Sequence, residues 1–281
     1  MDIIKALAKE LDKQEEHVSN VVTLLDEGNT VPFIARYRKE MHGTMDDQTI
    51  RTLADRLQYL RNLEERKKEV LSSIEAQGKL TEELRARIES AETLAAVEDE
   101  YRPFKQKRRT RATIAREKGL EPLALLLFAQ EKDCPAPEEA AKEYIDEEKG
   151  VSSVEEALAG AGDIIAENIS DDAAVRGALR DYAMKCGDVC SEAAKKDPED
   201  TVYRNYYKFT CAVKSIPSHR VLALNRGEKE GVLKVWVEVP HDNALELIFR
   251  RVVKKPACAS TAFVKAAAED AFDRLIEPSL E

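Results

Sequence analysis

Apolar residues along about the first hundred positions recur at the three- and four-residue steps of amphipathic helices. Residues 2–12 and 17–27 are each predicted to form a helix with one apolar face, and Gly28 can end the second helix. From Asp46 to about Gln77 the same steps continue as one long helix, apart from a charged stretch between Leu63 and Val70. Shorter helices follow over 81–90 and 92–101. The pattern predicts a multi-helix bundle with short, helix-turn-helix-like connections.

A shorter helix is predicted within residues 27–43, EGNTVPFIARYRKEMHG. Thr30 is a suitable N-cap for it. We expect Phe33, Ile34 and Tyr37 to point inward. The basic residues of this stretch are then expected to point outward; they are Arg36, Arg38 and Lys39.

After a polar stretch at 102–118, which is expected to enter a short helix near Ala112, the helical pattern resumes. The segment GLEPLALLLFAQ predicts a buried apolar helix, and Asp171 can cap a later one. The turn-like sequence KKDPED ends this part. We therefore predict a helical domain over 1–200 and a smaller one over 201–281.

The smaller domain combines helices with a minor β element. Residues 231–239, GVLKVWVEV, are rich in β-branched side chains and are followed by Pro240, which is typical of a strand. Before it, a helix capped by Ser218 is favoured over a hairpin. Helices are predicted again over 242–253 and from Ser260. The predicted fold class is mainly α with a minor β element near 231–239.

Composition narrows the function classes. The 281 residues are 43% hydrophobic and 35% charged, which supports packed cores and excludes a disordered chain. The net charge of -10 disfavours a protein coated by nucleic acid over its whole surface. Five scattered cysteines do not form a disulfide framework, and no apolar run reaches the roughly 18 residues of a membrane span. We expect a cytosolic protein without membrane contact.

One stretch is strongly basic, and we call residues 102–111 the basic segment. Lys and Arg can neutralise phosphates without reading base sequence, and the neighbouring Tyr101 and Phe104 offer rings that can stack on bases. The alternative is that Arg108 and Arg109 form ion pairs with acidic helices of the same domain. The candidate phosphate contacts are Arg102, Lys105, Lys107, Arg108, Arg109 and Arg111.

The second basic cluster, Arg36, Arg38 and Lys39, is a weaker candidate because its neighbours resemble a packed helix start, and Arg36 can instead pair within the core. His219 lacks a nucleophile or a positioned acid nearby in sequence, so a structural role is favoured. Cys186 and Cys190 lack the second ligand pair that zinc needs. The sequence predicts no catalytic residue, no metal site and no cofactor.

Three stretches of the chain resemble the Tex family of bacterial transcription accessory proteins. Within these stretches, Glu100, Arg102 and Gln106 differ from the residues expected for the family. These differences affect the expected shape of the basic segment. The matching stretches are LLDEGNTVPFIARYRKEMHG at 24–43, residues 57–124, and IPSHRVLALNRGEKEGVLKV at 216–235.

The resemblance implies an N-terminal region of a longer protein. The family's YqgF-like, helix-hairpin-helix and OB-fold RNA-binding domains are expected to lie outside these residues. It also implies a non-enzymatic module that binds RNA or DNA weakly and positions downstream domains of the same chain, with the transcription machinery as a further partner. The alternative is a structural scaffold or protein-interaction module that binds no nucleic acid.

Overall fold

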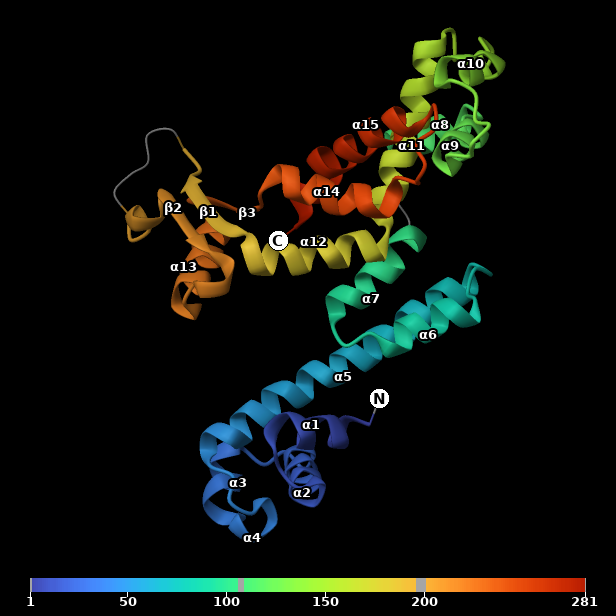
Figure 1. Ribbon diagram of the computed structural model, residues 1–281. Coiled ribbons are helices and arrows are strands. Elements are labelled where there is room, and N and C mark those ends of the chain that lie inside the picture. Colours follow the sequence, from blue (N-terminus) through green and yellow to red (C-terminus); the bar gives the residue numbers. More distant parts are fainter. Residues whose placement is uncertain (1, 106–108, 196–200, 281) are drawn as a thin grey trace. The chain divides into compact units, whose positions relative to one another are not determined.

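The computed structural model describes residues 2–105, 109–195 and 201–280 (Figure 1). The chain divides into two compact units; unit 1 ends at Phe104, and unit 2 begins at Lys105. The predicted mainly α fold with a minor β element is confirmed. The domain division predicted near residue 200 falls inside unit 2 and stays a prediction.

Unit 1 consists of helices joined by short connections. Side-chain caps start several of them: Asp46 accepts a hydrogen bond from the Thr49 amide at 2.7 Å, and Thr81 accepts one from the Leu84 amide at 3.2 Å. The helices are α1 (Ile3–Leu11), α2 (Glu15–Asp26), α3 (Val31–Tyr37), α4 (Lys39–His42), α5 (Asp47–Ala76), α6 (Glu82–Ser90), α7 (Leu94–Tyr101) and the 3-10 turn η1 (Arg102–Phe104).

The long helix α5 supplies much of the unit 1 core, as its sequence pattern predicted. Its buried stripe runs from Ile50 to Ile74 and crosses the charged stretch without a break. There Lys67 takes the apolar position with only 3% of its surface exposed. Its ammonium donates to the Glu89 carbonyl at 2.8 Å and to Glu64 at 3.0 Å, so the buried charge is paired.

Unit 2 is helical apart from one sheet. Its helices are α8 (Arg111–Glu117), α9 (Glu121–Ala129), α10 (Pro137–Ala141), α11 (Val154–Asp171), α12 (Ala173–Cys186), α13 (Ser218–Lys229), α14 (His241–Val252) and α15 (Thr261–Ala271). Short 3-10 or π turns accompany them; they are η2 (Lys142–Tyr144), η3 (Arg204–Tyr206), η4 (Val213–Ser215), η5 (Phe272–Ile276) and η6 (Glu277–Ser279).

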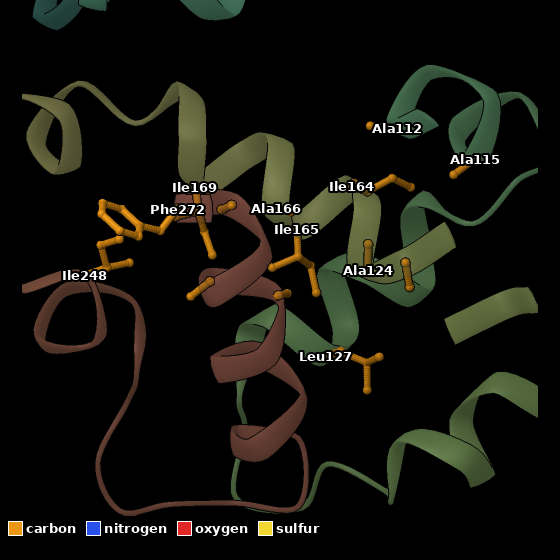
Figure 2. Packing of buried hydrophobic residues seen from close by; sticks show 14 of the residues in the cluster. Ala112, Ala115, Ala124, Leu127, Ile164, Ile165, Ala166, Ile169, Ile248 and Phe272 are labelled. Atoms are coloured by element: carbon orange, nitrogen blue, oxygen red, sulfur yellow. The ribbon is translucent and has the colours of Figure 1, made fainter. Parts of the chain in front are cut away.

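Helix α11 lies at the centre of the unit 2 core. It packs against α8, α9 and α15, and small alanines at Ala157 and Ala161 allow the close approach. Figure 2 shows Ile165 and Ile169 of α11 in the cluster that also holds Phe272. This core fixes the start of α8, whose first residue, Arg111, is also the last residue of the basic segment.

Three local predictions for unit 2 were wrong. Helix α9 is only half buried, since Leu125 is 57% exposed and Leu126 37% exposed. The cap of α12 is Asp172, which accepts from the Val175 amide, rather than Asp171. Helix α13 forms as favoured, but Ser218 is its first residue and makes no capping hydrogen bond.

In the described chain the sheet has three antiparallel strands in the order β2-β1-β3. They are β1 (Asp188–Ala193), β2 (Lys208–Ala212) and β3 (Leu233–Glu238), of which only β3 was predicted. Cys190 pairs with Thr210 on one side and with Trp236 on the other. Leu233 of β3 packs with Leu224 of α13 and with Tyr203, which gives this corner a small core of its own.

Candidate nucleic-acid interface

The second basic cluster lies on an exposed surface of unit 1 formed by α3 and α4. We call Phe33, Arg36, Tyr37, Arg38 and Lys39 the α3–α4 patch. The prediction that Phe33 and Tyr37 point inward is wrong: Phe33 is 36% exposed and Tyr37 63% exposed. Only Ile34 of the predicted apolar set is buried, and it packs on the core together with the half-buried Val31 and Ala35 of the same helix.

Three residues of the α3–α4 patch, Phe33, Tyr37 and Arg38, lie against one another. The rings of Phe33 and Tyr37, one helical turn apart, have centroids 5.3 Å apart and planes tilted by 44°. The Arg38 guanidinium lies 5.3 Å from the Phe33 ring centroid and donates to the Tyr37 carbonyl at 3.3 Å. Arg38 thus lies beside the Phe33 ring, and Arg36 and Lys39 are exposed in the same stretch of chain.

No carboxylate neutralises the α3–α4 patch within the part of the chain that the structure describes. None of the ion pairs found there within 4.0 Å involves Arg36, Arg38 or Lys39. The expectation that Arg36 pairs within the core is therefore wrong. An exposed cation without a bound carboxylate is available to an anionic ligand.

The basic segment begins in unit 1 and ends in unit 2. Arg102 is half-buried in η1, and Lys105 is exposed, although both take part in interactions with other side chains. Lys107 and Arg108 lie outside the described residues. Arg111 is the first residue of α8 and is exposed.

Arg109 faces solvent and also forms an ion pair. Its guanidinium lies 3.1 Å from the Glu117 carboxylate, and the two side chains are 71% and 56% exposed. An ion pair this open to water contributes little to stability, because solvent screens it. The pairing predicted as the alternative is thus present at Arg109, but it leaves the guanidinium at the surface.

The end of the basic segment is held firmly by a buried carboxylate that the sequence did not reveal. Glu167 of α11, 7% exposed, accepts from Arg116 at 2.6 Å and from the Thr110 hydroxyl at 2.9 Å. Thr110 also caps α8 by accepting from the Thr113 amide. The sequence did not predict this ion pair, because Arg116 is one of many cations in its stretch and Glu167 lies far along the chain in α11.

The aromatic residues beside the basic segment belong to the unit 1 core. Tyr101 and Phe104 are both half-buried and pack on it. The Tyr101 hydroxyl lies 2.9 Å from that of Ser73, and the Arg66 guanidinium lies 5.5 Å from the Tyr101 ring centroid. These contacts occupy the rings, so base stacking here is not favoured.

A further group of cations lies at one end of the sheet, where it lines a cavity with Tyr207. Lys208 and Lys234 stand on either side of Glu192 in the strand register, and Lys234 pairs with it at 3.3 Å. Only the pairing of three strands brings these lysines together, so the linear sequence offered no signal for them. The remaining cations of the cavity wall are Lys195 and Arg204.

The cysteine and histidine side chains that could act as metal ligands or catalytic groups do not form a common site. Cys186 is exposed at the end of α12, whereas Cys190 is buried in β1. His219 is exposed on α13 rather than held as a structural histidine. Within the described ranges, no three His, Cys, Asp or Glu side chains gather as metal ligands. None of the helices in those ranges has both the length and the apolar character needed to cross a membrane.

Comparison with known proteins assigns both parts of the chain to one family. Residues 1–75 match the profile described as Tex-like protein N-terminal domain, and residues 133–274 match the one described as Tex central region-like. The basic segment lies between the two matched regions.

Individual relatives agree with the profiles. YdcI of Bacillus subtilis is 44% identical over 279 residues, covering 98% of this chain and 38% of the relative. The transcriptional accessory protein Tex of Neisseria gonorrhoeae is 44% identical over 245 residues, covering 86% of this chain and 32% of the relative. The human S1 RNA-binding domain-containing protein 1 is 28% identical over 248 residues, covering 85% and 24%.

The chain thus spans well under half of the length of each of these relatives. Since the second profile alone matches just over half of its 281 residues, the chain belongs to the Tex family.

Proposed function

We propose that the chain is a non-catalytic module that contacts RNA or DNA phosphates through surface cations and positions further domains of a transcription accessory protein. The observation that carries the proposal is the exposure of Arg36, Lys39, Arg109 and Arg111 on the two basic surfaces. Side chains of this kind bind phosphates electrostatically and without sequence preference. The names of the gonococcal relative and the human relative, which refer to transcription and to RNA binding, support the proposal.

The acidic body of the protein restricts the proposed contact to these local surfaces. With a net charge of -10, the chain as a whole repels a polyanion at long range. Binding is therefore expected to be weak, to depend steeply on salt, and to require the α3–α4 patch, the basic segment or both.

Fluorescence anisotropy with single-stranded RNA and with duplex DNA at low salt tests the proposal. One variant replaces Lys105, Lys107, Arg108, Arg109 and Arg111 with Ala, and a second combines Arg36→Ala with Lys39→Ala. We expect each variant to weaken binding, and the second, which removes two cations, to lower the slope of log affinity against log salt by about 1.4 for a single strand and about 1.8 for a duplex. Lys5→Ala with Lys9→Ala on α1 removes the same charge as the second variant and is the control.

Each arm of this experiment has an outcome that contradicts the proposal. Unaltered binding by the five-residue variant removes the basic segment from the interface. Equal losses in the second variant and its control show a general charge effect rather than a site. Nuclease activity that persists through rigorous purification contradicts the non-catalytic part.

The second candidate is a scaffold that contacts only proteins. Helix α13 favours it, because Val221 is 37% exposed and Leu222 is 69% exposed. Near residue 203, Tyr203 is buried and Tyr206 is half-buried, whereas Val202 is 87% exposed and Trp236 is 37% exposed. A scaffold predicts no binding to either nucleic acid at low salt, so the same measurement separates the two candidates.

A further inference from the structure

We propose that Phe33 and Tyr37 of the α3–α4 patch form a stacking platform for unpaired bases, so that unit 1 selects single-stranded nucleic acid over duplex. This inference rests on the proposed function and specifies its ligand. It assigns the aromatic residues a role different from that of the cations around them.

The first argument is that the fold does not need these rings at the surface. Ile34, fully buried, holds α3 on the core together with the half-buried Val31 and Ala35, while Tyr37 leaves 63% of its surface in water. Two neighbouring exposed aromatic side chains form a contiguous apolar surface, which is more informative than a single one. A planar apolar ligand placed on them would remove this surface from water.

The second argument is the arrangement of rings and cations. Because the ring planes are tilted by 44°, a base would approach each ring from a different direction. Arg38 lies beside Phe33, and Arg36 and Lys39 are exposed in the same short stretch of chain. Proteins that bind single strands combine these two elements, aromatic faces for the bases and cations along the backbone.

The third argument concerns competing ligands. In a duplex the base faces are covered by their neighbours in the stack, so a duplex would use the cations but not the rings. An acidic peptide would likewise satisfy the cations and would offer the rings no planar base. The exposed aromatic pair therefore favours an unpaired strand.

The experiment uses the whole chain and three labelled ligands of about twelve nucleotides, which exceeds the smallest site size of a single-strand binding module. They are a base-bearing single strand, an abasic strand of equal charge, and a duplex. The variant Phe33→Leu with Tyr37→Leu keeps an apolar surface but removes the rings. Tyr37→Trp keeps a ring, and Arg36→Ala with Lys39→Ala removes charge only. Circular dichroism and thermal melting verify that each variant is folded.

We expect the leucine variant to lose about tenfold in affinity for the base-bearing strand, with little change for the abasic strand and an unchanged salt slope. Tyr37→Trp should retain binding. The charge variant should weaken binding to all three ligands.

Equal affinity of the wild type for base-bearing and abasic strands overturns the stacking platform and leaves the proposed phosphate contact intact. Tighter binding of the duplex than of the base-bearing strand overturns it as well. So does competition by poly-glutamate, if the leucine variant makes that competition weaker. If none of the three ligands binds at low salt, the proposed function fails together with this inference.

Discussion

His42 of α4 is buried in unit 1 without satisfying its polar atoms. The residue is 3% exposed, and neither ring nitrogen has a hydrogen-bond partner among the described residues. A neutral imidazole carries one donor and one acceptor, and leaving such groups unpaired inside a protein costs about 1–3 kcal/mol. At this position the imidazole therefore makes the folded protein less stable than an apolar side chain of similar size would.

Replacing the imidazole with a hydrocarbon of similar size should therefore stabilise the protein. We expect His42→Leu to raise the free energy of unfolding by about 1 kcal/mol, because the unpaired nitrogens are removed while the cavity stays filled. Urea unfolding of both proteins measures the difference. A loss of stability in the variant would reveal a polar partner for His42.

A second histidine has the opposite environment. His241 Nε2 lies 2.9 Å from a carboxylate oxygen of Asp273, and this hydrogen bond raises the pKa of His241 above its ordinary value of 6.5, with smaller contributions from Asp242 and Glu277. A raised pKa in the folded state means that folding favours the protonated ring. The stabilisation is complete below pH 6.5 and is lost as the pH rises through the raised value.

We therefore expect Asp273→Asn to lower the pKa of His241 and to destabilise unit 2 at acidic pH, with the difference disappearing as the pH rises through the raised pKa. The effect on stability should be small because the His241 side chain is 44% exposed. Titration of the imidazole by NMR in both proteins gives the pKa directly. An unchanged titration curve in the variant would show that the hydrogen bond does not form in solution.

At the scale of elements, the contact between α8 and α11 depends on the buried carboxylate of Glu167. Breaking a buried ion pair from one side usually costs about 3–5 kcal/mol. Here the loss should be smaller, because Arg116 is 30% exposed and retains Asn168 at 3.0 Å and Glu121 at 3.5 Å.

We expect Glu167→Ala to destabilise unit 2 by about 2 kcal/mol, since it also removes the acceptor of the Thr110 hydroxyl. Chemical denaturation followed by circular dichroism measures the change. Glu121→Ala, which removes the longer and more exposed ion pair of the same arginine, is the matched control and should cost little. Equal costs for the two substitutions would contradict the role given to burial.

How well the sequence predicted each element depends on the length of its pattern. For α5, thirty residues with one apolar stripe determine both the helix and its buried face. Helix α3 has seven residues, with apolar side chains on more than one side, so its buried face could not be chosen from periodicity. The aromatic surface of the α3–α4 patch was missed for this reason.

The strands β1 and β2 were missed for a different reason. Their sequences DVCSEA and KFTCA carry little alternation of their own, and their pairing joins Asp188 to Ala212 and to Glu238. Cross-strand neighbours stabilise such segments, and those neighbours are distant in sequence. The lysines that this pairing brings beside Glu192 could therefore not be predicted either. The cations of the α3–α4 patch and of the basic segment could be predicted, because each set is contiguous in the sequence.

At the scale of the whole molecule, two separate cores support the basic surfaces. The α3–α4 patch belongs to unit 1, and Arg109 and Arg111 belong to unit 2. Each surface is therefore carried by its own packed helices, and the affinity of each is expected to respond to substitutions in its own unit. This is why the two sets of variants are tested separately.

Trp236 on β3 makes the two units optically distinct. It is the single tryptophan of the chain and lies in unit 2, 37% exposed. Excitation at the red edge of protein absorption therefore reports on unit 2 without any change to the sequence. In unit 1 the only aromatic emitters are tyrosine and phenylalanine, so a tryptophan placed at Tyr37 would give unit 1 an optical signal of its own.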